Sequence, residues 1–209
     1  MPALAYNLIK SRLHKAPDGR EDSTMSSLTI RNFMKQQGFV EEPDNVCNMH
    51  FSGLYFQPRI VGSLVVAGII LQFFSALGAA VLYLALSALL WWNVAVPKGN
   101  PFELFYNRVL AIPKGKATLA PAPGPRRFAQ GMAAAFMLIV GVSLLQGWMM
   151  TAYVFEAGLV MAFSALLFGK FCLGAYIYHL MRGNVAFANS TLPWSGRSRQ
   201  APRLHKHQV

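Results

Sequence analysis

Charged residues are scarce in this 209-residue sequence, and two long stretches have almost none. They make up 13% of the chain, whereas soluble globular domains have about 25%. No charged side chain occurs between Ile60 and Pro97, and Glu156 is the single one between Phe128 and Gly169. Apolar blocks of this length are typical of bilayer-spanning segments, so the sequence predicts an integral membrane protein.

Motifs of common enzyme and metal sites are also missing. The sequence has no glycine-rich phosphate loop, no Gly-x-Ser-x-Gly and no His-Glu-x-x-His pattern. Cysteine occurs only as Cys47 and Cys172, both in segments that we assign to the cytoplasmic side, where thiols stay reduced. Cys47 and His50 offer fewer ligands than a structural zinc site requires. We therefore predict no catalytic residue, no metal site and no disulfide.

Each apolar block is too long for a single transmembrane helix. Residues 60–92 would rise about 50 Å as one helix, whereas the hydrocarbon core is about 30 Å thick. Each block is therefore predicted to fold back as a hairpin. The first block leaves an alternative open, a single tilted and kinked helix, because its turn contains little beyond Ser75 and Gly78. The predicted spans cover residues 60–74, 79–96, 128–147 and 153–169.

Positive charge predicts how the spans are oriented. Seven Lys and Arg lie in the segment that ends at Arg59, six lie between the hairpins, and six lie from Lys170 onward. Neither hairpin turn has any, so the positive-inside bias places both termini and the central loop in the cytoplasm. The net charge of +11 then suits anionic lipid of the cytoplasmic leaflet, and nucleic acid is an unnecessary partner.

The predicted fold is all-α, with four transmembrane helices in two tight hairpins. Residues 1–57 form a cytoplasmic and interfacial segment with short amphipathic helices. For the first of these helices, a solvated helix or a partly disordered start is an equally good interpretation. Residues 58–181 form the transmembrane bundle, whose last part, 170–181, is an interfacial extension. Residues 182–209 form a basic tail that we expect to be disordered or ordered only by a partner.

Three polar residues of the apolar blocks form a candidate site. Gln72, Gln146 and Glu156 would all lie toward the outer ends of their helices, where they could meet at one depth. An ionisable group inside the membrane is a functional candidate. Glu156 is, however, only a few residues from a turn that water can reach, so a solvated carboxylate is the plainer interpretation.

Cys172 and His179 are a candidate thiol and a candidate ligand after the last span. A histidine at the membrane edge can ligate haem or a chlorin. No second histidine lies near His179 in the sequence, so we predict no cofactor, and contact of His179 with a haem or pigment stays as the minor alternative.

Aromatic and basic residues outside the spans predict a protein partner. Aromatic residues beside arginine are typical anchors at protein interfaces, and the chain has such residues before the first span and in the tail. We expect contacts with another membrane protein subunit through Phe51, Tyr55, Phe56, Trp194, Arg197 and Arg199.

Two motifs add a resemblance to a known family. The segment Pro125-Arg-Arg-Phe-Ala-Gln130 opens the third span, and Gly169-Lys-Phe-Cys-Leu-Gly174 closes the fourth. With the two hairpins and the proline-rich basic loop between them, these motifs resemble a family of bacterial four-span membrane proteins known only as a domain of unknown function. The resemblance covers residues 57–180 and implies a location in the bacterial inner membrane.

Relatives in that family often have a second cysteine three residues after the first, where this chain has Ala175. A dithiol could shuttle electrons, whereas Cys172 alone cannot close a local disulfide. Two functions stay open. The one we favour is a non-catalytic accessory or stabilising subunit of a larger membrane complex. The alternative is a thiol-redox or small-solute transport protein.

Overall fold

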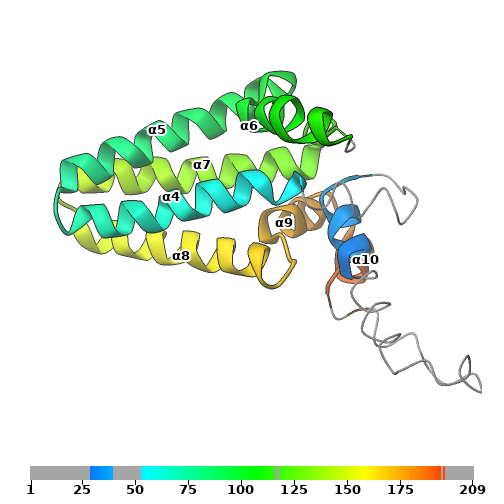
Figure 1. The fold of residues 1–209 in the computed structure, drawn as a ribbon. Coiled ribbons are helices and arrows are strands. Elements are labelled where there is room, and N and C mark those ends of the chain that lie inside the picture. The colour runs from blue at the N-terminus through cyan, green and yellow to red at the C-terminus, as the bar shows by residue number, and fades with distance from the viewer. Residues whose placement is uncertain (1–28, 40–52, 116–117, 194, 196–209) are drawn as a thin grey trace, which may run out of the picture.

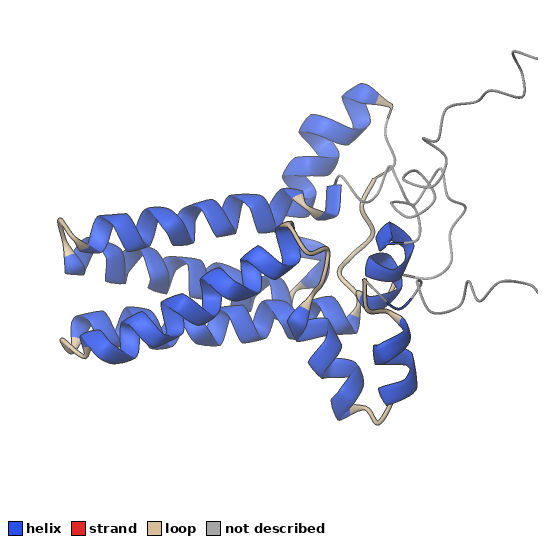
Figure 2. Cartoon of the chain, turned by 90° about the horizontal axis from the view of Figure 1, so that it is seen from below, coloured by secondary structure: helices blue, strands red, loops and turns tan. Residues whose placement is uncertain are grey.

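The computed structural model describes residues 29–39, 53–115, 118–193 and 195. Four long helices lie side by side, and the described residues contain no strand (Figures 1 and 2). The predicted all-α class is confirmed. The four helices are α4 (Phe56–Gln72), α5 (Ala76–Ala95), α7 (Gly124–Leu145) and α8 (Met149–Leu167).

Three of the four helices, α5, α7 and α8, are long and apolar enough to cross a membrane. The fourth, α4, is apolar but has only 17 residues. Each helix begins slightly earlier than predicted. For example, α7 begins at Gly124 rather than at residue 128, because its first turn includes Arg126 and Arg127, which the apolar pattern left out.

The two hairpin turns form where turn chemistry favours them. Ser75 caps α5, and its Oγ accepts a hydrogen bond from the backbone N–H of Gly78 at 3.0 Å. The chain reverses there, so the alternative of one kinked helix over the first block is wrong. The second turn contains Gly147 at φ +73°, a left-handed conformation that glycine adopts without a steric penalty.

Two buried hydroxyl groups inside the bundle donate hydrogen bonds to backbone carbonyls of neighbouring helices. The hydroxyl of Tyr83 on α5 donates to the carbonyl of Val65 on α4 at 3.1 Å. The hydroxyl of Ser87 donates to the carbonyl of Ala134 on α7 at 2.8 Å. Such bonds join helices in lipid, where no water competes for these groups.

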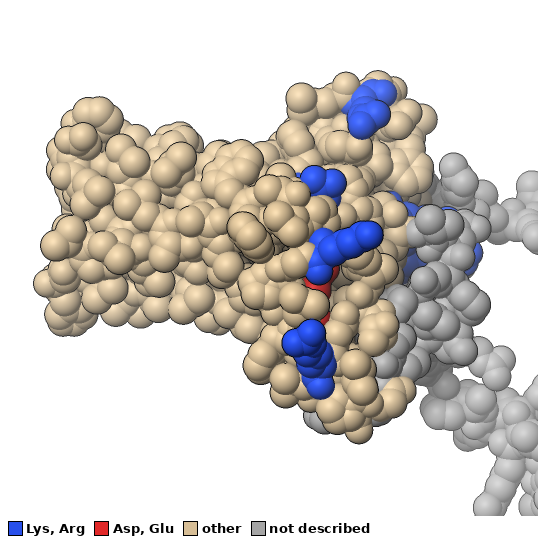
Figure 3. Space-filling model, turned by 90° about the horizontal axis from the view of Figure 1, so that it is seen from above, with Lys and Arg blue, Asp and Glu red and all other residues tan. Residues whose placement is uncertain are grey.

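Shorter helices gather at one end of the bundle, which we call the capped end (Figures 1 and 2). They include a helix at residues 29–36 and α6 (Pro101–Phe105), which continues as a π-helix, η2 (Tyr106–Ala111). The chain reaches the capped end again in α9 (Leu173–Met181) and α10 (Val185–Ser190). In the view of Figure 3 the Lys and Arg side chains also lie near this end, and the rest of the bundle surface shows none.

The expectation of a disordered tail is wrong for residues 182–193. Helix α10 folds back on α9, where the ring centroids of Phe187 and His179 are 4.8 Å apart. The hydroxyl of Tyr176 also donates to Asn189 Oδ1 at 2.9 Å. These contacts come from tertiary packing, which the absence of sequence periodicity could not reveal.

Candidate functional site

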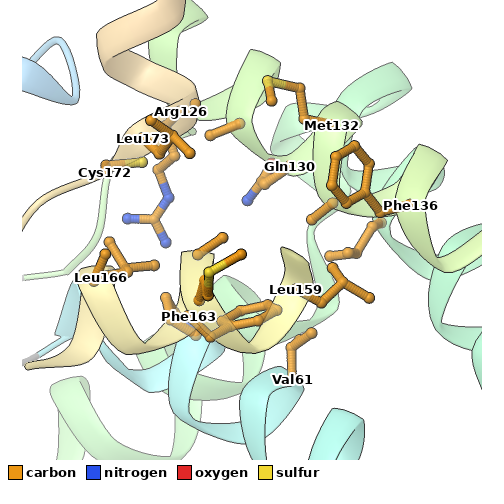
Figure 4. Close-up of a pocket in the computed structure, with 18 of the residues that line it drawn as sticks. Val61, Arg126, Gln130, Met132, Phe136, Leu159, Phe163, Leu166, Cys172 and Leu173 are labelled. Atoms are coloured by element: carbon orange, nitrogen blue, oxygen red, sulfur yellow. The ribbon is translucent and has the colours of Figure 1, made fainter. Parts of the chain in front are cut away.

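A cavity of about 430 Å³ lies among α4, α7, α8 and the start of α9 (Figure 4). This volume is within the usual range for small-molecule sites, about 300–1,000 Å³. Met161 lines the cavity and is also 68% exposed, so the cavity meets the outer surface of the bundle at α8. Its walls are mostly apolar and include Val61, Met132, Phe136, Leu159, Phe163 and Leu166.

Arg126 brings a positive charge into this apolar space. Its guanidinium points into the cavity (Figure 4), although the residue is only 5% exposed. Its Nη2 lies 3.9 Å from Oε1 of Glu103 on α6, which is too long for a hydrogen bond. Within the described residues its Nη1 has no hydrogen-bond partner. The buried guanidinium is therefore only partly compensated.

Glu103 is the buried counter-charge of Arg126. Burial raises the pKa of the Glu103 carboxyl, and the nearby Arg126 guanidinium and a hydrogen bond with Asn100 oppose that rise. Glu103 does not line the cavity, whereas Arg126 does, so the positively charged residue of the pair faces the cavity.

Three amide side chains form a buried hydrogen-bonded row beside Arg126. Asn100 Oδ1 accepts from the backbone N–H of Phe102 at 3.0 Å, and its Nδ2 donates to Gln57 Oε1 at 3.4 Å. Gln57 Oε1 also accepts from Nε2 of Gln130 at 3.0 Å. Gln57 and Gln130 both line the cavity, so this row forms part of its polar end.

Cys172 lines the same end of the cavity. Its backbone N–H donates to Gln36 Oε1 at 2.9 Å, which ties the start of α9 to the helix at residues 29–36. Burial raises the pKa of the Cys172 thiol. A neutral thiol is a weak nucleophile and a weak metal ligand.

His179, the second candidate ligand, does not line the cavity. Its Nε2 lies 3.0 Å from the carbonyl oxygen of Gln36, and its ring packs edge-on against Tyr178 and Phe187. This nitrogen is therefore already engaged within the chain.

The structure joins two of the three residues predicted as an outer polar cluster. Gln72 Nε2 donates to Glu156 Oε2 at 3.0 Å, and both residues are buried. Tyr83 lies beside them, close enough to interact with the Glu156 carboxyl. Gln146 is exposed at the end of α7 and takes no part in this contact.

The aromatic residues expected to meet a partner pack within the chain where they are described. Tyr55 is buried, and its hydroxyl donates to the carbonyl of Leu166 at 2.9 Å. Phe56 packs against Phe105, with ring centroids 5.9 Å apart, and against Tyr106. Four other candidates lie outside the described residues: Phe51, Trp194, Arg197 and Arg199.

Sequence reasoning missed Arg126 and Gln130 as site residues, although both stand in the motif that opens α7. Their spacing of four places them on one face of a helix, and this signal could have identified them. Gln57, Asn100 and Glu103 had no such signal, because Gln57 lies on α4 and the other two lie at the start of α6, far from Arg126 in the sequence.

The comparison with protein families covers most of this region, from α4 onward. The model of a family described as a domain of unknown function (DUF4395) matches residues 56–182. No curated protein and no solved structure matches the chain. The family match runs from the first residue of α4 to just past α9, and it includes Gln57, Arg126, Gln130 and Cys172. The resemblance seen in the sequence is thus confirmed, and the chain belongs to the DUF4395 family.

Proposed function

We propose that this chain is a four-span membrane protein that binds an amphiphilic ligand in the cavity at its capped end. The observation that carries the proposal is Arg126, a buried guanidinium that points into an otherwise apolar cavity. A buried charge is costly unless it is paired and hydrogen-bonded. A ligand with a polar group at Arg126 and an apolar body along the walls would meet both requirements.

The position of the cavity supports an amphiphile taken from the bilayer. Met161 and Met132 lie on two of the helices that border it, α8 and α7, and Met161 is exposed on the outer face of α8. In a membrane, lipid chains would cover that face. A ligand could therefore enter sideways, with its polar group at the level of the helix ends.

The alternative is that Arg126 has a structural role only. Its pairing with Glu103 could serve only to hold α6 against α7. In that case the cavity would need no ligand, and loss of Arg126 would lower stability without changing what the protein binds. The experiment below separates these two roles.

Three observations support four spans with both flanking segments on the cytoplasmic side. Helix α4 is short, but 17 residues is at the lower limit of about 17–25 for a transmembrane helix. Gln36, ahead of the first span, contacts Cys172 and His179, after the fourth, so both segments lie at the same end. An even number of crossings satisfies this arrangement. The Lys and Arg side chains near the capped end favour a cytoplasmic location, as in the bacterial inner membrane.

The test is to purify the full chain in mild detergent and identify co-purifying amphiphiles by native mass spectrometry. Arg126→Gln removes the charge in the cavity. Arg127→Gln removes the same charge from the next residue, whose guanidinium donates instead to the carbonyl of Val94, at 3.1 Å from Nε and 2.6 Å from Nη2. Arg127 does not line the cavity.

We expect the wild type and Arg127→Gln to retain the same bound amphiphile. Arg126→Gln should lose it by about tenfold or more, since the removed partner is a buried charge. Folding of each variant is checked by size-exclusion chromatography. Equal amphiphile content in the wild type and a folded Arg126→Gln protein would leave only the structural role of Arg126.

The accessory-subunit hypothesis stays a prediction. Its tail residues, Trp194, Arg197 and Arg199, lie outside the described residues. Because α10 packs on α9, the informative truncation ends at Ser195 and keeps that contact. The truncated protein should insert normally but lose a co-migrating subunit in mild extracts. If both forms migrate alone, the hypothesis is wrong.

A further inference from the structure

The orientation of the amide row at the polar end follows from one backbone group. The N–H of Phe102 can only donate, so the Asn100 atom that it meets is Oδ1. The other side of that amide, Nδ2, then donates to Gln57, which must present Oε1. Because Gln57 Oε1 accepts there, the atom of Gln130 that meets it is Nε2.

This orientation places a donor of Gln130 at the cavity. An amide nitrogen has two N–H groups, and one of those on Gln130 is used by Gln57. Figure 4 shows the nitrogen of Gln130 pointing into the cavity, across from the guanidinium of Arg126. The amide oxygen of Gln130 is buried and has no hydrogen-bond partner within the described residues. Gln130 therefore offers the second N–H to a ligand.

Arg126 adds further donors and a positive charge at the same place. A guanidinium has N–H groups only and accepts no hydrogen bond. Glu103, its counter-charge, lies 3.9 Å away and does not line the cavity. Gln57 Oε1, an acceptor near the cavity, already receives two hydrogen bonds. Arg126 and Gln130 thus favour a partner that accepts hydrogen bonds and carries negative charge.

We infer that the ligand is an acidic lipid or fatty acid, whose carboxylate or phosphate accepts hydrogen bonds from Arg126 and Gln130. This inference rests on the proposed function for the existence of a ligand and adds the chemistry of its polar group. Carboxylate and phosphate oxygens match the planar fork of a guanidinium. An alcohol of the same chain length leaves the charge of Arg126 compensated only by Glu103 at 3.9 Å, and a quaternary amine is repelled by it.

The test uses four amphiphiles with the same alkyl chain and different polar groups: a carboxylate, a phosphate monoester, an alcohol and a trimethylammonium. Each is titrated into delipidated full-length protein in a non-ionic detergent. Binding is measured by displacement of a fluorescent fatty acid. The carboxylate and phosphate arms also separate a free fatty acid from a phospholipid-type ligand.

In the wild type, the carboxylate or the phosphate should bind about tenfold more tightly than the alcohol, and the trimethylammonium should bind most weakly. Arg126→Gln should abolish this preference, whereas Arg127→Gln should preserve it. Gln130→Leu should weaken binding of the anion several-fold and leave the alcohol unchanged, since it removes one donor.

Two outcomes overturn different conclusions. If all four amphiphiles bind the wild type equally and Arg126→Gln weakens them equally, the cavity binds a ligand but the inference about its charge is wrong. If no amphiphile binds the wild type, the proposed function itself fails. The comparison of the four amphiphiles on the wild type needs no variant, so it remains decisive even if Arg126→Gln does not fold.

Discussion

The thiol of Cys172 is held where it ionises poorly. Burial raises its pKa, and backbone hydrogen bonds near Ala175 and the charge of Arg126 offset this only in part. The reactive species in alkylation is the thiolate. Since a raised pKa leaves less thiolate at a given pH, the folded protein should react slowly at pH 8 and faster as the pH rises toward that pKa.

We therefore expect iodoacetamide to label Cys172 in a Cys47→Ser protein about tenfold more slowly when folded than when denatured. Mass spectrometry at intervals gives the two rates, and the denatured sample is the control. Equal rates would show a thiol that is exposed or ionised, and they would strengthen the thiol-redox alternative.

Gln72 and Gln146 provide a matched pair of glutamines near the same end of the bundle. Gln72 donates to the buried carboxyl of Glu156, whereas Gln146 is exposed. Gln72→Leu removes a donor from a buried acceptor, which costs about 1–3 kcal/mol. Gln146→Leu should change stability by less than about 0.5 kcal/mol. Thermal unfolding midpoints in the same detergent compare the two. Similar midpoints for both variants would mean that water satisfies Glu156.

At the scale of elements, Gly174 sets how closely α9 approaches α7. A Cβ at Gly174 would lie 2.7 Å from both Cα and Cβ of Ala129, so a helix backbone would have to move. This contact gives a physical reason for the glycine in the Phe-Cys-Leu-Gly motif. Gly131 lies on α7, as Ala129 does, and has room for a Cβ, whose nearest neighbour would be Val94 at 3.8 Å.

Gly174→Ala should therefore destabilise the protein by about 1–3 kcal/mol through overpacking. Gly131→Ala should be neutral or stabilise by about 0.5–1 kcal/mol, because alanine favours helix more than glycine does. Thermal unfolding of the two variants and the wild type measures this difference. An unchanged midpoint for Gly174→Ala would show that α9 can shift without cost.

Some elements could be predicted from local sequence and others could not. The two hairpins were predictable because each apolar block exceeds the bilayer thickness, and Ser75 and Gly147 mark the turns. Helix α10 was not, because six residues have little intrinsic helical stability and form a helix here by packing Phe187 on His179.

At the scale of the whole molecule, the proposed four-span arrangement predicts three reporter positions. Reporters fused after Val209 and within residues 114–120 should show a cytoplasmic location, because Lys and Arg surround both sites. A reporter inserted near Gly78, in a turn without basic residues, should be external. Alkaline phosphatase and green fluorescent protein fusions measure the two sides. An external reading at Val209 would exclude an even number of crossings.

The sequence by itself determined the membrane class, the four apolar helices and the family, because apolar length, charge placement and short motifs act locally along the chain. The cavity was decided only by the tertiary structure. Gln57, Arg126, Gln130 and Cys172 come from three separate parts of the chain, and their meeting depends on how α4, α7, α8 and α9 pack. The direction of the Gln130 amide depends further on a backbone N–H in α6. Each amide of the row takes its orientation from the group that it bonds to. Those groups lie on elements far apart in the sequence, so local sequence does not encode the orientation.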